Sequence, residues 1–233
     1  MNAYEELQRL TQREREYLVS APLITRAREG RITREHYLAF LEQAYHHVRH
    51  TVPLMMAVGS RLQPHQHWLQ KEIVHYLEEE LGHDEWILND IDAAGGDAAR
   101  VRSSTPAIET DAMVAYAYDT VMRRNAVGFF GMVFVLEGTS ASLALSAADG
   151  IQRSLGLPVR AMTYLRSHGT LDQEHVGHLA GILQRLDPSA DFPAVLQCAR
   201  AMFWLYGNMF RSLERLVLEP PRMASAASAE VAA

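Results

Sequence analysis

One segment of the chain carries an acid and a histidine at a spacing that suits metal binding. In YLEEELGHDEW, Glu80 and His83 are three residues apart, so on a continuous helix they share one face, about 60° apart. A carboxylate and an imidazole so placed can bind one ion, and Glu-x-x-His pairs are typical of di-iron carboxylate bundles. Glu72 and His75 repeat the pattern on another face, so the motif alone is equally compatible with a solvated Glu-His pair.

A second segment, SHGTLDQEHVGH, places three potential ligands along one stripe of a helix. His168, Asp172 and His175 follow the spacing i, i+4, i+7, which brings their side chains to the same face. His178 continues the stripe, either behind the ligands or in solvent. A polar surface stripe is the alternative interpretation, but three ligand types in register favour a metal site.

A third feature is the lone carboxylate of Glu137 within GMVFVLEGTSASLAL, a stretch of apolar and small residues. Burying an unpaired charge costs several kcal/mol, so such a group normally has a partner. The partner can be a metal ion, an arginine or the end of a helix, and the residue by itself does not decide among them.

Taken together, these features predict a site with three carboxylates and three imidazoles from three helices. The candidate metal ligands are Glu80, His83, Glu137, His168, Asp172 and His175. This mixture of hard and borderline ligands suits iron or manganese, whereas zinc takes fewer ligands and calcium or magnesium few imidazoles. Six ligands with three negative charges suit two divalent ions and leave room for dioxygen.

The segment LEQAYHHVRH adds further polar groups on an earlier helix. Glu42, His46 and His50 share a face, and His47 points partly aside. Polar packing against the next helix is one interpretation. The other gives catalytic roles to this face, with Glu42 as a seventh ligand and His46 or His50 orienting a ligand or donating protons.

The elements that position these residues are all expected to be helices, because apolar residues recur at helical spacing and no run alternates as strands do. Helices are expected over residues 3–18, 33–62, 65–93, 110–125, 127–155, 159–186 and 191–217. Thr33 is a predicted N-cap, Pro53 should kink or divide its helix, and Gly169 could break another. The prediction is one seven-helix bundle domain over residues 1–218 and a disordered tail over 219–233.

Composition restricts the class of protein. The chain has 233 residues, of which 48% are hydrophobic and 21% charged, a balance typical of one soluble globular domain. The net charge of −6 argues against nucleic-acid binding, and we identify neither a signal peptide nor an unbroken apolar run of about 20 residues, so we expect a cytoplasmic protein without a membrane partner. The single cysteine, Cys198, excludes a disulfide framework and a cysteine-based zinc cluster.

The three ligand blocks resemble those of the heme-oxygenase-like di-iron oxidases. Their order is Glu80-x-x-His83, then Glu137, then His168-x3-Asp172-x2-His175. The resemblance covers roughly residues 30–215 and implies the seven-helix fold of heme oxygenase, the TenA thiaminases and the pyrroloquinoline-quinone synthase (PqqC). It also implies two Fe(II) ions, or manganese, which activate dioxygen through a peroxo-level intermediate. The expected partners are a small organic substrate and an external reductant, and a homodimer is compatible with the resemblance.

The resemblance implies the reaction class but not the substrate. Expected reactions are C–H or amine oxidation, desaturation and oxidative cleavage, with Glu137 bridging the two ions. Side chains near the ligand-bearing faces are candidates for the substrate pocket: Trp86, Phe130, Phe134, Tyr164 and Arg166. Each aromatic could equally be ordinary core, and Arg166 either holds a substrate carboxylate or lies on the surface. The apolar run GFFGMVFV favours a lipid-like or aromatic substrate.

Other interpretations remain open. Ferritin-like bundles order their ligands Glu, Glu-x-x-His, Glu, Glu-x-x-His, which Glu42 and Asp172 would complete, but His168 is superfluous in that scheme. A metal-independent pocket enzyme or ligand-binding protein of the TenA and PqqC type is the main alternative, although the thiaminases need a mid-chain cysteine and Cys198 lies near the end. An interaction module with a polar core is the third.

Overall fold

The structure is a computed structural model that describes residues 2–218, and within them it contains helices and turns but no strand. The α-helices are α1 (Ala3–Leu10), α2 (Gln12–Val19), α3 (Pro22–Arg28), α4 (Arg34–Val48), α5 (Thr51–Ser60), α6 (Leu69–Glu80), α7 (His83–Ala93), α8 (Ala98–Ser103), α9 (Ile108–Arg123), α10 (Phe130–Leu155), α11 (Thr163–Arg185) and α12 (Asp191–Leu218). Short 3₁₀ turns cover Pro64–Gln66, Ala126–Phe129 and Val159–Ala161. The predicted tail, 219–233, lies outside the described residues.

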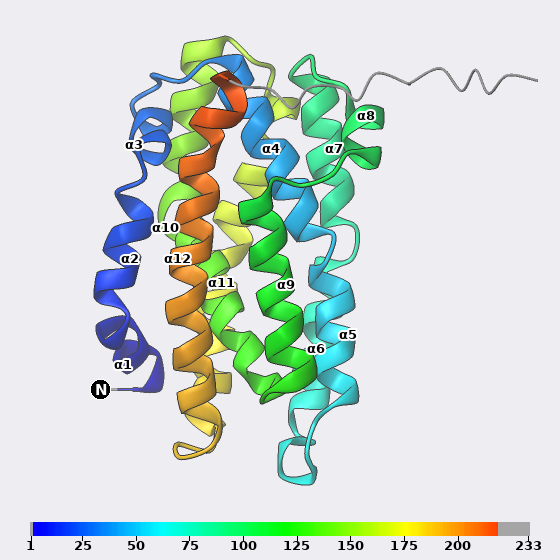
Figure 1. Cartoon of the computed structure of the whole chain (residues 1–233), viewed down its shortest axis with the longest axis vertical. Helices are drawn as coiled ribbons and strands as arrows, with labels where there is room; N and C mark the ends of the chain where they lie inside the picture. Colours follow the sequence, from blue (N-terminus) through cyan, green and yellow to red (C-terminus); the bar gives the residue numbers. More distant parts are fainter. Residues whose placement is uncertain (1, 219–233) are drawn as a thin grey trace, which may run out of the picture.

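The long helices run along the long axis of the molecule and form one bundle (Figure 1). Helix α10 packs most extensively against α11 and also against α12 and α3, while α4 packs against α7 and α12. The buried apolar residues form a single core cluster. The all-α bundle predicted from sequence is therefore confirmed, but the chain divides into more helical segments than the seven expected.

Several predicted helices are divided, each by an identifiable local feature. The helix expected over 3–18 breaks at Thr11, whose buried hydroxyl donates to the carbonyl of Leu7 at 2.7 Å. The helix capped by Thr33 ends at Val48, so that Pro53 lies in the first turn of α5, where its missing N–H is tolerated. Helices α3 and α8 lie in stretches for which no helix was predicted.

Gly169 does not break its helix, contrary to the expectation. Helix α11 continues through it, and a Cβ at this position would come 2.8 Å from the side chain of Leu145 on α10. The glycine thus permits a close approach of the two helices that carry most of the candidate ligands. Close approach, rather than flexibility, explains the residue.

The helix expected over 65–93 is broken at Gly82, which adopts a left-handed conformation with φ +91°. Glycine takes up this conformation without the steric cost that a Cβ would impose. Glu80 is consequently the last residue of α6 and His83 the first of α7. The expectation that both share one face of a continuous helix is wrong, and their proximity has another origin.

The stretch 126–155, which contains α10, is long and apolar enough to cross a membrane when only its length and composition are considered. The expectation from sequence differed because Glu137 and small polar residues interrupt its apolar run. In the structure 61% of its most apolar window is buried against the rest of the bundle. That burial is typical of the core helix of a bundle.

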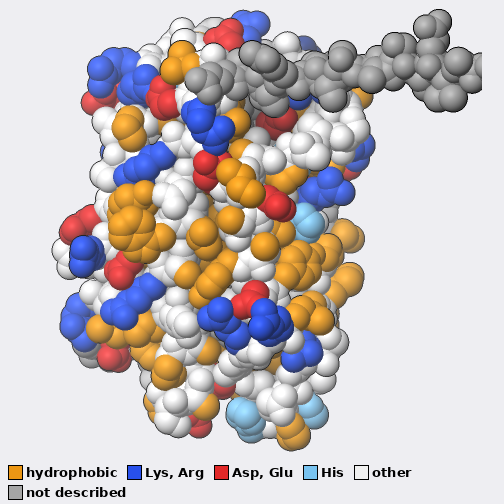
Figure 2. All heavy atoms as spheres, in the orientation of Figure 1, with side chains coloured by type: hydrophobic (Ala, Val, Ile, Leu, Met, Phe, Trp, Pro, Cys, Tyr) orange, Lys and Arg blue, Asp and Glu red, His pale blue; other side chains and the backbone are white. Residues whose placement is uncertain are grey.

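The face of the molecule drawn in Figure 2 mixes basic, acidic and apolar side chains. No field of a single charge sign extends across this view of the described residues. The acidic and imidazole groups of interest lie inside the bundle, so the surface gives little indication of them.

Candidate metal centre

The six candidate ligands come from the ends of α6 and α7 and the middle of α10 and α11. Two groups of donor atoms each lie within 4.8 Å of one another. One group comprises Glu80, His83 and His168, and the other comprises Glu80, Glu137 and His175. Glu80 is common to both groups, whereas Glu137 belongs to one. Asp172 belongs to neither, although its Oδ1 lies 3.3 Å from Nδ1 of His175. Two adjoining cation sites are thus compatible with the side chains as they stand.

The break at Gly82 brings the first two ligands together. His83 Nδ1 and Glu80 Oε2 are 3.1 Å apart and hydrogen-bonded, and both residues are buried. Burial alone would raise the pKa of Glu80, but the hydrogen bond with His83 and the nearby imidazoles hold that pKa below its usual value. A carboxylate that stays ionised in the interior is suited to bind a cation.

Helix α11 supplies three ligands on one stripe, as its spacing predicted. His175 Nδ1 lies 3.3 Å from Asp172 Oδ1 and 3.7 Å from Glu137 Oε1. The ring of His168 packs 4.7 Å from that of His83, and its Nδ1 lies 3.2 Å from the carbonyl of Tyr164. Because a carbonyl only accepts, this contact places the proton on Nδ1 of His168 and leaves Nε2 free for a metal ion.

Several buried oxygen and nitrogen atoms in this cluster, all of which could bind a metal ion, have no hydrogen-bond partner. They are Glu137 Oε2, both carboxylate oxygens of Asp172, and His175 Nδ1. Burial first, and then the charges of Asp172, Glu80 and Glu79, raise the pKa of Glu137 well above its usual value. Unsatisfied buried carboxylates are rare because they are costly, and a divalent cation would satisfy them. These atoms and the mixed carboxylate and imidazole donor set fit iron.

Glu79, which the sequence analysis did not select, stands behind one ligand. Its Oε2 lies 3.1 Å from Nε2 of His175, on the opposite side of the ring from Asp172. A carboxylate in this position can hold a proton on Nε2 and so direct Nδ1 toward the ligand cluster. The run of three glutamates in YLEEELGH indicated a concentration of acids. It did not indicate which of the three side chains would point toward His175.

Asp90, also not selected, holds the start of α11. Its carboxylate is fully buried and accepts hydrogen bonds from the backbone N–H groups of Thr163 and Tyr164, at 3.0 and 2.8 Å. Burial raises the pKa of Asp90 to about 6 despite these bonds. The cap fixes the first turn of α11, one turn before His168. In WILNDIDA, Asp90 is one of two acids within an apolar helical pattern, and this was the only signal in the sequence.

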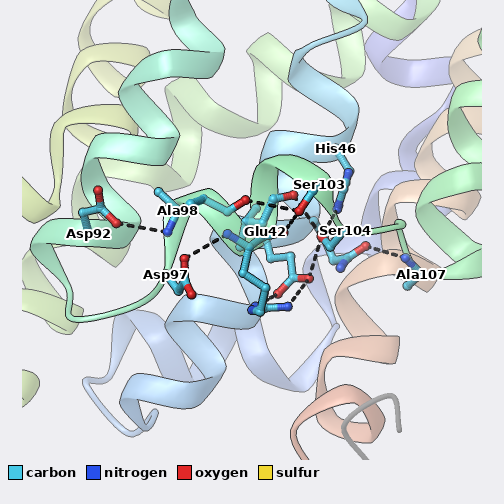
Figure 3. A network of polar contacts seen from close by, with 12 residues as sticks. Glu42, His46, Asp92, Asp97, Ala98, Ser103, Ser104 and Ala107 are labelled. Carbon is cyan, nitrogen blue, oxygen red and sulfur yellow. Dashed lines mark hydrogen bonds and ion pairs between the residues drawn. The ribbon is translucent and has the colours of Figure 1, made fainter. Parts of the chain in front are cut away.

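Glu42 and His46 are not brought to the cluster. The guanidinium of Arg100 donates to both carboxylate oxygens of Glu42, at 3.3 and 2.7 Å, and the hydroxyl of Ser104 donates to the same carboxylate at 3.1 Å. His46 Nε2 lies 2.9 Å from that hydroxyl (Figure 3). His50 instead contacts the hydroxyl of Tyr118. We refer to Glu42, His46, Arg100 and Ser104 as the Glu42 network.

Two cavities adjoin the ligand cluster. The inner cavity, of about 60 Å³, is bordered by Glu80, Glu137, His168 and Asp172 and also by His47. The outer cavity, of about 80 Å³, lies between α3, α4, α10, α11 and α12 and is almost entirely apolar. The two share four side chains: Ser140, Tyr164, His168 and Tyr206.

Of the predicted substrate-pocket residues, only Tyr164 lines these two cavities. Trp86 packs its ring 4.0 Å from that of His83. Phe130 packs near Tyr76, Phe134 contacts Tyr4 and Phe203, and Arg166 donates to Asp149 and Gln152 on α10. These four side chains support the helices that carry the ligands rather than border the cavities.

Cys198 lies on α12, is buried, and lines neither the inner nor the outer cavity. Burial raises the pKa of its thiol to about 12. Only a thiolate is an effective nucleophile, so this residue is unsuited to covalent catalysis at the cavity.

Both the sequence and the fold of the chain resemble those of known proteins. A family model described as iron-containing redox enzyme matches residues 38–207. No curated protein matches the chain. The structure is similar to a domain of unknown function with a heme oxygenase-like fold from Shewanella denitrificans (21% identity, TM-score 0.83, covering 94% of this chain and 96% of that one).

Two further solved structures show the same fold at lower identity. One is a TenA homologue from Pseudomonas syringae (12% identity, TM-score 0.77, covering 92% of this chain and 94% of that one). The other is heme oxygenase-2 from a Synechocystis species in complex with heme and NO (16% identity, TM-score 0.71, covering 93% and 87%). At these identities the likeness establishes a heme-oxygenase-like fold.

Proposed function

The chain belongs to the family of iron-containing redox enzymes, and on this premise we propose that it is a di-iron oxidase that uses dioxygen to oxidise a small organic substrate. The observation that carries the proposal is the set of buried, unpartnered donor atoms on Glu137, Asp172 and His175. A metal-independent enzyme would have no need to keep these atoms unsatisfied. The reaction class remains the one that the ligand pattern implies.

In the proposed site, six residues from four helices would hold the iron. Glu80 belongs to both groups of metal-binding atoms, His83 and His168 belong to one, and Glu137 and His175 belong to the other. Asp172 belongs to neither group but lies 3.3 Å from His175, and it would complete the set of residues that hold the iron. Iron bound there would supply electrons to dioxygen and make a substrate C–H or N–H bond open to oxidation.

The surrounding residues orient the ligands and exclude water. The carbonyl of Tyr164 fixes the proton on Nδ1 of His168, and Glu79 faces Nε2 of His175. The walls of the inner cavity are apolar apart from the ligands, His47 and a few hydroxyls, with Met132 and Phe129 among them. Such walls keep bulk water from a reactive centre and leave the substrate as the nearest reductant.

The test is anaerobic loading with Fe(II), followed by measurement of bound iron and of oxygen consumption with a panel of fatty acids, amines and amino acids. We expect up to two iron ions per chain and substrate-dependent oxygen uptake. Binding of no more than trace iron, together with the absence of an oxygen-dependent optical change, would refute the proposal.

The chain offers a matched control for the ligand assignment. Glu72 and His75 repeat the Glu-x-x-His spacing of Glu80 and His83, but Glu72 pairs with Arg185 and His178, and His75 is exposed. Glu80→Gln and His83→Ala should therefore lose iron, while Glu72→Gln and His75→Ala keep it. If His83→Ala leaves the iron content unchanged, the metal-independent alternative is favoured.

A further inference from the structure

His47 is a buried histidine without a partner. It lies on α4, its side chain is 1% exposed, and neither ring nitrogen makes a hydrogen bond. The ring of Tyr206 packs edge-on at 5.7 Å, which is an apolar contact only. A histidine left unsatisfied in the interior costs stability, so its retention needs a reason other than packing.

The nitrogens of His47 do not belong to the metal ligand set. The two groups of donor atoms include Glu80, Glu137 and three other histidines, but not His47. It nevertheless borders the inner cavity together with those ligands. Burial lowers the pKa of His47 to about 3, so its ring is neutral and offers one hydrogen-bond donor and one acceptor. The unsatisfied imidazole of His47 therefore borders the inner cavity, next to the candidate metal ligands.

The outer cavity shows what else would occupy that space. It adjoins the inner cavity, because Tyr164, Tyr206, His168 and Ser140 line both. Its walls are aliphatic and aromatic side chains of α3, α4, α10, α11 and α12, and its polar residues besides the tyrosines are His36, Thr139, Ser140 and His168. No lysine or arginine lines either cavity within the described residues. A molecule that fills both cavities would have an apolar body and little charge.

The acidic residues restrict the polar end of that molecule. The acids of the inner cavity are Glu80, Glu137 and Asp172, all of which serve as metal ligands in the proposed site. An ammonium group would therefore find no free counter-charge there. A hydroxyl oxygen, in contrast, can accept the N–H of a neutral imidazole, and so can a carboxylate oxygen in the iron-loaded protein, where the metal offsets its charge.

We propose that His47 binds the polar end of the substrate, and that the substrate is a small molecule with one oxygen-bearing polar end and an apolar body directed into the outer cavity. The proposal rests on the proposed function for the identity of the reaction, but the contact itself depends only on the cavity and on His47. In this proposal His47 contacts the substrate, whereas the sequence analysis assigned the functional roles on this helix to Glu42 and His46.

The test compares four probes that share one apolar body: 3-phenylpropan-1-ol, 3-phenylpropanoate, 3-phenylpropylamine and propylbenzene. Their dissociation constants are measured by calorimetry on the metal-free protein and on the anaerobic Fe(II)-loaded protein, for the wild type and for His47→Phe. We expect the substitution to weaken binding of the alcohol in both forms, and of the carboxylate in the Fe(II)-loaded form, about threefold to tenfold, the value of one hydrogen bond. Binding of propylbenzene should stay within about twofold. The amine should bind more weakly than the alcohol to the Fe(II)-loaded wild type, in which the acids of the inner cavity are engaged by the metal.

Two further measurements separate binding from structure. His47→Gln, which keeps a donor and an acceptor, should retain most of the preference for the alcohol over propylbenzene. In the metal-free wild type, the alcohol should shift the ¹⁵N resonances of the His47 ring, and propylbenzene should shift them less. This second measurement needs no variant, so it decides the question even if His47→Phe fails to fold.

The outcomes distinguish the two proposals. Equal weakening of all probes by His47→Phe, or the absence of probe binding, overturns the role of His47 while leaving the iron site intact. A protein that binds no iron but loses its preference for the alcohol in His47→Phe supports the role of His47 and refutes the di-iron function.

Discussion

Two regions of this protein combine acids and histidines on neighbouring helices, and they differ in how their polar atoms are satisfied. In the Glu42 network, Arg100 and Ser104 donate to the carboxylate of Glu42, and His46 contacts the same hydroxyl. In the ligand cluster, atoms of Glu137, Asp172 and His175 are more deeply buried than Glu42 and Arg100 and have no hydrogen-bond partner.

The difference teaches that residue type and spacing do not separate a metal site from a structural network. Both regions satisfy the sequence criteria, and both use helical spacing on one face. Helix α8 and its C-cap bring a guanidinium and a hydroxyl to Glu42, whereas the ion pairs within the ligand cluster join acids to imidazoles. No lysine or arginine lines the cavity beside the acids of the second region within the described residues, and this lack of a counter-charge from the protein favours the iron proposed there.

The largest expected effect comes from removing the charge that lacks a partner. Glu137→Gln should lower bound iron at least tenfold, because it removes an anionic ligand. The same change should raise the free energy of unfolding of the metal-free protein, by about 1–3 kcal/mol at pH 7, because it relieves a buried carboxyl of raised pKa. Iron analysis and urea unfolding measure the two effects. Loss of both iron and metal-free stability would indicate a structural role and contradict the comparison.

The second prediction concerns the pH dependence of the metal-free protein. Because the pKa of Glu137 is raised in the folded state, the folded protein keeps a proton that the unfolded chain releases above about pH 4.5. Raising the pH therefore favours unfolding, by up to about 1.4 kcal/mol per pH unit from this group. The difference in unfolding free energy between Glu137→Gln and the wild type should grow from pH 5 to pH 7. Parallel profiles would show that Glu137 does not titrate abnormally.

The stripe on α11 could be predicted from sequence because a regular helix fixes the positions of its own side chains. The same is true of the apolar stretch around Glu137 and of the overall helical bundle. In these cases local periodicity and tertiary structure agree. The order of the ligand blocks then sufficed to identify the family.

The junction of α6 and α7 could not be predicted in the same way. Glu80 and His83 were selected correctly as neighbours, but on the assumption of a continuous helix, and the left-handed Gly82 invalidates it. A glycine within an apolar helical pattern is compatible with either outcome, and tertiary packing decides between them. The partners Glu79 and Asp90 depend on contacts between helices distant in sequence, which spacing alone does not encode.

The third prediction uses a buried carboxylate that does have donors. Asp90→Ala should lower the free energy of unfolding by about 2 kcal/mol, because the N–H groups of Thr163 and Tyr164 lose their acceptor at the start of α11. The sign is opposite to that expected for Glu137→Gln, although both changes remove a buried acid. Urea unfolding of the metal-free variants measures it. A gain in stability would show that hydrogen bonds do not separate the two kinds of carboxylate.

The smallest effect is expected in the Glu42 network itself. Glu42→Gln should change the free energy of unfolding by less than about 1 kcal/mol, because the pair with Arg100 is partly exposed and such pairs contribute little. Bound iron should stay at the wild-type level, since the carboxylate already has its donors and borders neither cavity. The role of seventh ligand suggested by the sequence predicts the opposite, a loss of iron. Iron content measured beside that of Glu137→Gln decides between them, and a loss in both variants would mean that Glu42 leaves Arg100 to join the cluster when metal binds.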